Sequence, residues 1–119
     1  MVFDLKLPAG CPKEDASEFE GTVYRLVQTD PPTGTDLLTY LELNRFPALD
    51  SCKRGALSLF CKRTQAQHRL DISPHLGKYV ASIGLTAAHG RCSRPSKAGH
   101  MSWWPYTKMR NPDDLKVIG

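Results

Sequence analysis

Nine prolines and nine glycines divide this 119-residue chain into short segments. The strongest interruption is DPPTG at residues 30–34, since proline lacks an amide donor and glycine favours turns. The chain has no heptad pattern, internal repeat or low-complexity tract. We therefore expect short elements joined by irregular connections.

Strand-type segments recur between these interruptions. β-branched and aromatic residues at 22–27 and an apolar run at 56–61 predict strands. Residues 115–118 predict a terminal strand, whereas 79–85 fit either a strand or a continued helix. Four strand candidates in so short a chain favour one sheet.

Helix signals are fewer. One helix is predicted from residue 35 or 36 to residue 44, with leucines on its buried face, and another over 64–70. Ser73-Pro74 is a further start signal, because proline suits the first helical position. Residues 86–100 are typical of a long loop.

Together these elements predict an α+β fold. The length fits one small domain over 1–119, with an irregular lead-in over 1–20. We expect a mixed or antiparallel sheet with short helices.

The charge balance and cysteine content bound the setting. Sixteen basic and twelve acidic residues give a net charge of +4, and a basic face attracts anions. The longest weakly polar run, 79–88, is about half of a membrane span, and no signal-peptide pattern is present. A soluble, cytoplasmic protein with no membrane partner is expected. Its four cysteines are then expected to be mostly buried thiols, although two disulfides are possible.

Histidines and cysteines raise the question of a metal. His89, Cys92 and His100, with Cys61 or His75 as a fourth ligand, have the residue types that suit zinc. Their spacing matches no standard zinc pattern, and we predict no metal site.

One cysteine has the setting of a reactive thiol. Arg91 and Arg94 flank Cys92 and would favour its thiolate, but no histidine is shown by the sequence to reach it. An idle or buried thiol is the preferred interpretation.

Cations and aromatic side chains gather in the last third of the chain. Both tryptophans lie in HMSWWPY at 100–106, after a cation-rich loop over 89–97. Arginine and lysine can bind phosphates while aromatic rings stack on bases. We therefore predict a module that binds an anionic partner, a nucleotide or nucleic acid, with Arg25 able to join a ligand-binding set formed by Arg91, Arg94, Lys97, His100, Trp103, Trp104 and Tyr106.

A second interpretation comes from a family resemblance that covers about a third of the chain. The segment VYR at 23–25, followed by Pro31-Pro32, resembles the first motif of ADP-ribosyltransferase toxins. In that family an arginine on the first strand holds the bound NAD, and a later serine-bearing strand supports the site. Arg25 matches the arginine, and Ser58 in LSLF loosely matches the serine.

The chain departs from this family at the catalytic glutamate. All four glutamates precede Ser58, whereas the family's glutamate follows the serine strand. Asp113 or Asp114 would have to substitute, or His100 would serve in a histidine-based variant. The resemblance thus implies NAD as cofactor and Arg25, Ser58 and His100 as catalytic candidates. A third possibility is a protein–protein adaptor or small inhibitor.

Overall fold

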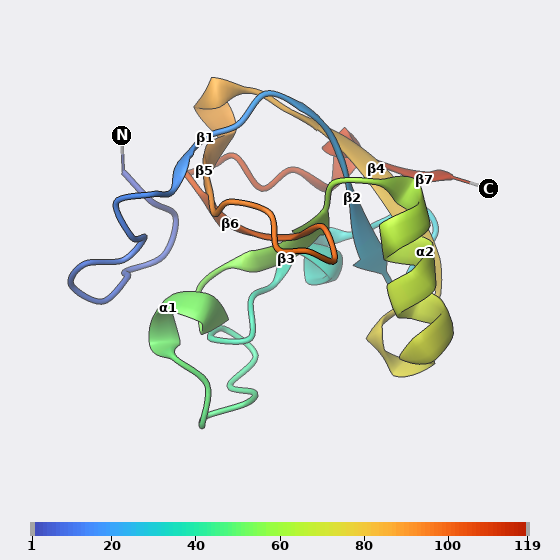
Figure 1. Ribbon diagram of the computed structural model, residues 1–119, viewed down its shortest axis with the longest axis horizontal. Coiled ribbons are helices and arrows are strands. Elements are labelled where there is room, and N and C mark those ends of the chain that lie inside the picture. The colour runs from blue at the N-terminus through green and yellow to red at the C-terminus, as the bar shows by residue number, and fades with distance from the viewer. Residues whose placement is uncertain (1, 119) are drawn as a thin grey trace.

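The computed structural model describes residues 2–118, which form one antiparallel sheet with two α-helices and short 3-10 turns (Figure 1). The strands are β1 (Ser17–Glu18), β2 (Gly21–Val27), β3 (Leu57–Phe60), β4 (Tyr79–Leu85), β5 (Gly90–Cys92), β6 (His100–Pro105) and β7 (Leu115–Ile118). The helices are α1 (Ser51–Arg54) and α2 (Arg63–Ile72), and the 3-10 turns are η1 (Gly34–Leu37), η2 (Pro74–Leu76), η3 (Ala87–His89) and η4 (Pro112–Asp114). The expected α+β class is confirmed.

The sheet has the strand order β1-β5-β6-β3-β2-β4-β7. Side chains from both halves meet in one core cluster, in which Cys92 and Trp103 from β5 and β6 share an interior with Ile83 and Leu115 from β4 and β7. Residues far apart in the strand order can share a core only because the sheet curves around it, as Figure 1 shows. Trp103, which is fully buried, is the largest side chain of this core.

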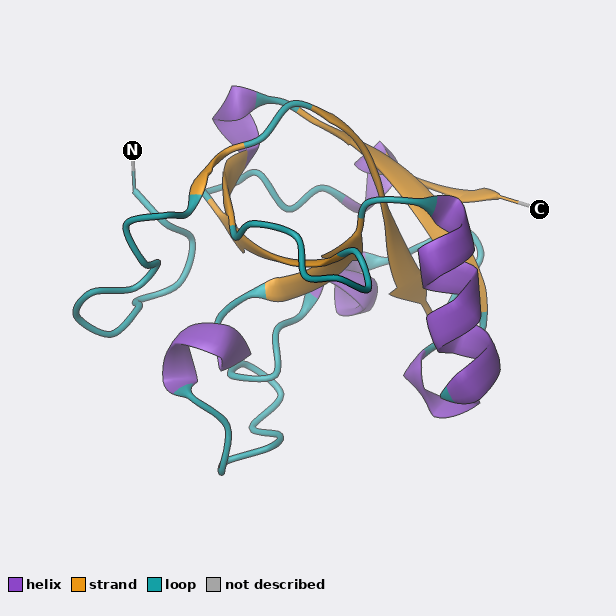
Figure 2. Ribbon diagram, viewed as in Figure 1, coloured by secondary structure: helices purple, strands orange, loops and turns teal. Residues whose placement is uncertain are grey.

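The opposite face carries a smaller cluster under α2. Alternate residues of a strand face opposite sides, so Phe60 points away from the core that holds Leu59. Phe60 packs there with Ala66 of α2 and Val80 of β4. The two α-helices lie on separate sides of the molecule (Figure 2), so α2 covers only part of this face.

Most of the sequence-based expectations are confirmed. The predicted strands over 22–27, 56–61 and 115–118 appear as β2, β3 and β7, and the ambiguous segment 79–85 is β4. The predicted helix over 64–70 appears as α2, while Ser73-Pro74 starts only the 3-10 turn η2. Neither α-helix in the described part of the chain has the length and apolarity of a bilayer-crossing helix.

The helix expected over 35–44 is wrong. Only the 3-10 turn η1 forms, and Leu38 is already extended with φ −83° and ψ 136°. Thr39 then accepts and donates hydrogen bonds with Glu42, so a local side-chain network replaces the helical ladder. Asn44 adopts a positive φ of 54°, which an α-helix does not allow.

The long loop expected over 86–100 is also only partly present. Residues 90–92 form β5 and His100 starts β6, and the two strands pair with Arg91 opposite Trp104. Their pairing was missed because β5 is only three residues long and Gly90 begins it. The loop proper is confined to residues 93–99.

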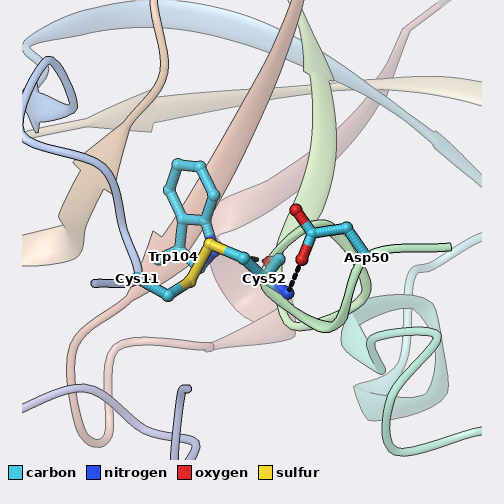
Figure 3. The surroundings of a disulfide bond; sticks show 4 residues. All are labelled: Cys11, Asp50, Cys52 and Trp104. Carbon is cyan, nitrogen blue, oxygen red and sulfur yellow. Dashed lines mark hydrogen bonds between the residues drawn. A yellow bond between two sulfur atoms is a disulfide. The ribbon is translucent and has the colours of Figure 1, made fainter. Parts of the chain in front are cut away.

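Two of the four cysteines form a disulfide, which corrects the expectation of free thiols. Cys11 in the lead-in is bonded to Cys52 at α1, next to the indole of Trp104 (Figure 3). Asp50 caps α1 by accepting from the Cys52 amide at 2.8 Å, and Trp104 Nε1 donates to the Cys52 carbonyl at 2.9 Å. Cys61 and Cys92 remain free. The disulfide therefore joins the irregular lead-in to the segment before β3.

We predict that the disulfide stabilises the fold by up to about 4 kcal/mol, since it closes a loop whose ends lie 41 residues apart. The double variant Cys11→Ala/Cys52→Ala should unfold at lower denaturant than the wild-type protein. Cys61→Ala is the control, because that thiol is free and half-buried. Equal midpoints for the double variant and the wild type would contradict the prediction.

We also predict that Gly90→Ala lowers the free energy of unfolding by more than about 2 kcal/mol. Gly90 has φ +141°, and an added Cβ would collide with the Trp104 carbonyl oxygen. Gly84→Ala is the matched control, since nothing lies within 4 Å of its Cβ position. Urea unfolding of both variants gives the comparison, and Gly84→Ala should change stability by no more than about 0.5 kcal/mol.

Candidate functional site

The main cleft opens where β2 and β3 separate. These strands pair only at Tyr24 opposite Phe60, so beyond that point no ladder closes the sheet. The cavity measures about 340 Å³, near the lower end of ligand pockets. Its walls come from β2, β3, η1, α2, η2, the first residue of β6 and the segment 38–46. Arg25, Ser58 and His100, which the sequence analysis singled out, all line it.

Arg25 crosses the gap between the separated elements. Its Nε donates to the Asp36 carbonyl at 2.8 Å, and its Nη1 donates to the Ser58 carbonyl at 2.9 Å. In a continuous sheet, a backbone amide of β2 would donate to the Ser58 carbonyl. Here the guanidinium of Arg25 donates to it instead. A single side chain links η1, β2 and β3 around the cleft.

The charge of Arg25 has no ion-pair partner among residues 2–118. None of the three ion pairs in this part of the chain includes it. Burial lowers the pKa of Arg25 to about 10, although Tyr40 and Asp36 act in the opposite direction. Arg25 stays protonated at neutral pH. A largely buried cation at the wall of a cleft favours an anionic occupant.

Asp36 lies beside Arg25, but its carboxylate is already committed. One oxygen accepts from the Gln28 amide at 2.7 Å, and the other accepts from the Thr33 amide and the Thr29 hydroxyl. Burial acts to raise the pKa of Asp36, and these hydrogen bonds outweigh it and hold the pKa below its usual range. Asp36 organises the 28–36 turn and leaves no lone carboxylate directed at a ligand.

Ser58 and His100 form a pair on neighbouring strands. His100 Nε2 lies 3.0 Å from Ser58 Oγ, within hydrogen-bond distance. The His100 ring also contacts Phe60 edge-on, with centroids 5.7 Å apart. Both members of the pair are half-buried at the cleft, so the ring is held in place while the hydroxyl stays reachable.

His100 is a neutral imidazole at physiological pH. Burial, then the positive charges of Arg69 and Lys53, lower its pKa from the ordinary value of 6.5. A neutral ring with Nε2 unprotonated can accept the Ser58 proton, which is the arrangement of a general base next to a hydroxyl.

Cations dominate the rest of the cleft. Arg45 and Arg69 line it, and among the described lining residues Asp36 alone is acidic. Tyr40 and Phe46 add an aromatic pair with centroids 4.8 Å apart. Nothing in the sequence indicated that these residues belong to the site, because Arg69 and Phe46 are distant from Arg25 in the chain and only the fold brings them to one cavity.

The expected aromatic surface of the last third of the chain is wrong. Trp103 is fully buried, and Trp104 and Tyr106 are 6% and 5% exposed. Trp103 Nε1 donates to the His89 carbonyl at 3.1 Å, so this indole, like that of Trp104, is saturated internally. Tyr106 donates its hydroxyl to Glu18 at 2.9 Å. These rings anchor the core and cannot stack on a base.

The cations of the same expected site remain at the surface. Arg91, Arg94 and Lys97 are exposed, but none of them lines the cleft. Of the ligand-binding set predicted from the sequence, only Arg25 and His100 meet in the cavity. The proposed aspartate substitutes are also elsewhere, since neither Asp113 nor Asp114 lines the cleft and Asp114 lies 3.4 Å from His89.

The alternatives based on metal and thiol chemistry find no geometric support. Across residues 2–118 no three histidine, cysteine or acidic groups come together as metal ligands. His89 is occupied by Thr86, whose amide donates to Nδ1 at 3.0 Å. Burial, with a smaller effect of Cys61, raises the pKa of Cys92 to about 12 and makes this thiol unreactive.

No family model, curated protein or solved structure matches this chain. The site is therefore interpreted from its own geometry.

We predict that His100 makes the fold less stable in mild acid. Its pKa is depressed in the folded state, so the unfolded chain takes up a proton first as pH falls below about 6.5. Stability should decline as pH falls through this window and recover as pH rises. His100→Gln should reduce that slope in urea unfolding from pH 7.5 to 5.0, and His68→Gln on the exposed face of α2 should leave it unchanged.

Proposed function

We propose that this protein binds NAD in the cleft at Arg25 and acts on it as an ADP-ribosyltransferase-like enzyme of a histidine-based kind. The proposal is supported above all by the meeting of Arg25, Ser58 and His100 in one cavity. These are the residues for which the family resemblance implied roles, and they come from three different strands. That all three candidates line the same cavity is less expected by chance than that any one of them does.

The electrostatics of the cavity support an anionic ligand. Arg25 forms no ion pair within the described residues, and the charge of the neighbouring Asp36 compensates it only in part. Arg45 and Arg69 add two more cations. A pyrophosphate provides negative charge for such a group of guanidinium donors. In this reading Arg25 holds the phosphates, and His100 performs the proton transfer that a glutamate performs in the toxins.

NAD supplies an activated glycosidic bond, and the protein holds and directs it. Arg25 would orient the ligand against β3, since its own Nη1 is bonded to the Ser58 carbonyl at 2.9 Å. The neutral His100 ring, 3.0 Å from Ser58 Oγ, would accept a proton there. The apolar side chains of Leu57 and Phe60 restrict water on that wall.

A second candidate is the anion-binding module that the basic loop predicted. Its support is the exposure of Arg91, Arg94 and Lys97 on and after β5. Without exposed aromatic rings, such binding would rest on phosphate charge alone, so it would lack base stacking and weaken steeply with salt. A protein adaptor or inhibitor is the third possibility.

The cytoplasmic location expected from the sequence stays a prediction. The Cys11–Cys52 disulfide is of the kind that persists in oxidising compartments.

We predict that NAD binds the wild-type protein, and that Arg69→Ala and Arg25→Lys each weaken binding at least about tenfold, because a charge-assisted contact is worth about 1.5–3 kcal/mol. Lysine keeps the charge at residue 25 but cannot donate to two carbonyls and a phosphate together. Titration calorimetry with NAD measures the affinity, and circular dichroism checks the fold of each variant.

The matched control is the double variant Arg91→Ala/Arg94→Ala, which removes two exposed cations outside the cleft. It should bind NAD like the wild type. The proposal would be replaced by the anion-binding module under two combined outcomes. The wild-type protein would fail to bind NAD, and it would bind an oligonucleotide in a salt-sensitive way that the double variant loses.

A further inference from the structure

We propose that Ser58 is a nucleophile that takes the ADP-ribosyl group of NAD onto its own Oγ, with His100 as the base, so that transfer proceeds through a covalent serine intermediate. This inference rests on the proposed function, because it requires NAD in the cleft. It departs from the role that the family resemblance implies for the serine, which is to support the site.

Among the described residues, no free carboxylate lines the cleft. Asp36 is the one acidic residue among the described lining residues, and both of its oxygens already accept hydrogen bonds. Glu42, on the segment beside the cavity, is bonded to both Nη atoms of Arg110. Neither can act as the base that deprotonates an acceptor.

Two histidines within residues 2–118 line the cleft, His100 and the exposed His75, and it is His100 that is hydrogen-bonded to Ser58. His100 Nε2 faces Ser58 Oγ at 3.0 Å, which is the distance between a nucleophile and its general base. The contact with Phe60 and the pairing of β3 with β6 hold the two side chains together. A base so placed serves the hydroxyl of Ser58 before it serves any incoming acceptor.

Ser58 also lies next to the guanidinium of Arg25. Arg25 Nη1 donates to the carbonyl of Ser58 itself, at 2.9 Å. A ligand whose phosphates contact Arg25 is therefore bound next to the residue that bears the hydroxyl. The same residue links the cation and the nucleophile.

The chemistry needs two reactants, NAD and an acceptor hydroxyl, and it requires no oxidant or reductant. Ser58 Oγ attacks C1′ of the nicotinamide riboside, His100 takes the hydroxyl proton, and the bond from C1′ to the pyridinium nitrogen breaks. Its electron pair leaves with neutral nicotinamide. An acceptor hydroxyl then attacks C1′, the bond from C1′ to Ser58 Oγ breaks, and His100 returns its proton to Ser58 Oγ. The proton of the acceptor hydroxyl is released to the solvent, so one proton is produced per NAD consumed. Each displacement inverts C1′, so the overall reaction retains the β configuration of NAD.

The test incubates the full chain with NAD in buffer that contains methanol. Intact-mass spectrometry and fragmentation look for one ADP-ribosyl group on Ser58, and NMR assigns the anomer of any methyl ADP-ribose. We expect either the Ser58 adduct or the β-methyl product, and Ser58→Ala should abolish both while NAD binding persists. His100→Gln should slow nicotinamide release by at least about 100-fold, the lower end of the contribution of a general base.

Ser82→Ala is the matched control, because Ser82 lies on β4 outside the cleft and its hydroxyl makes only a 3.5 Å contact with the Lys116 carbonyl. It should behave like the wild type. An α-methyl or mixed product, a β-product that survives Ser58→Ala, or bound NAD with neither adduct nor product would overturn the covalent step and leave NAD binding standing. Failure of the wild-type protein to bind NAD would overturn both proposals.

Discussion

The guanidinium of Arg25 is the interaction on which the architecture around the cleft depends. β2 and β3 pair at a single position, and beyond it Arg25 donates to the carbonyls of Ser58 and Asp36. Without these bonds, two backbone acceptors at the opening would lack donors, which costs free energy when they are buried. The same group places a positive charge at the cavity wall, which the nearby Asp36 compensates only in part. One side chain therefore both links the elements around the cleft and carries the charge on which the proposed function depends.

The cleft can stay open because the rest of the sheet is closed by other means. The curved sheet packs both of its halves around Trp103, and the Cys11–Cys52 disulfide holds the lead-in against Trp104. Each indole also donates to a backbone carbonyl, at His89 and at Cys52. Where β2 and β3 separate, less apolar surface is buried and the fold loses stability. The packing and hydrogen bonds of the two indoles offset that loss. A rigid frame then presents Ser58 and His100 at a defined 3.0 Å separation.

Local pattern predicted the elements whose cause is local. The β-branched and aromatic residues of β2 and the helical segment of α2 were visible in the chain, because both depend on neighbours a few residues apart. The helix expected over 35–44 failed because the backbone finds other partners after η1. The Thr39 amide donates to the Glu42 side chain, and the Leu41 amide donates to the distant Arg54 carbonyl. The ligand-binding role predicted for Trp103 and Trp104 was wrong because their burial depends on which strands pair with β6, and the sequence does not show that pairing.

The sequence by itself determined the class of the fold and the basic balance, since residue type and local spacing carry that information. A family resemblance added Arg25, Ser58 and His100 as candidate site residues. Only the tertiary structure decided that these three side chains share one cavity, that the indoles are buried and that Arg91 and Arg94 lie elsewhere. The reason is that strand order is non-local. The register of β3 with β6 places His100, 42 residues away, beside Ser58, and no short window of sequence encodes that pairing.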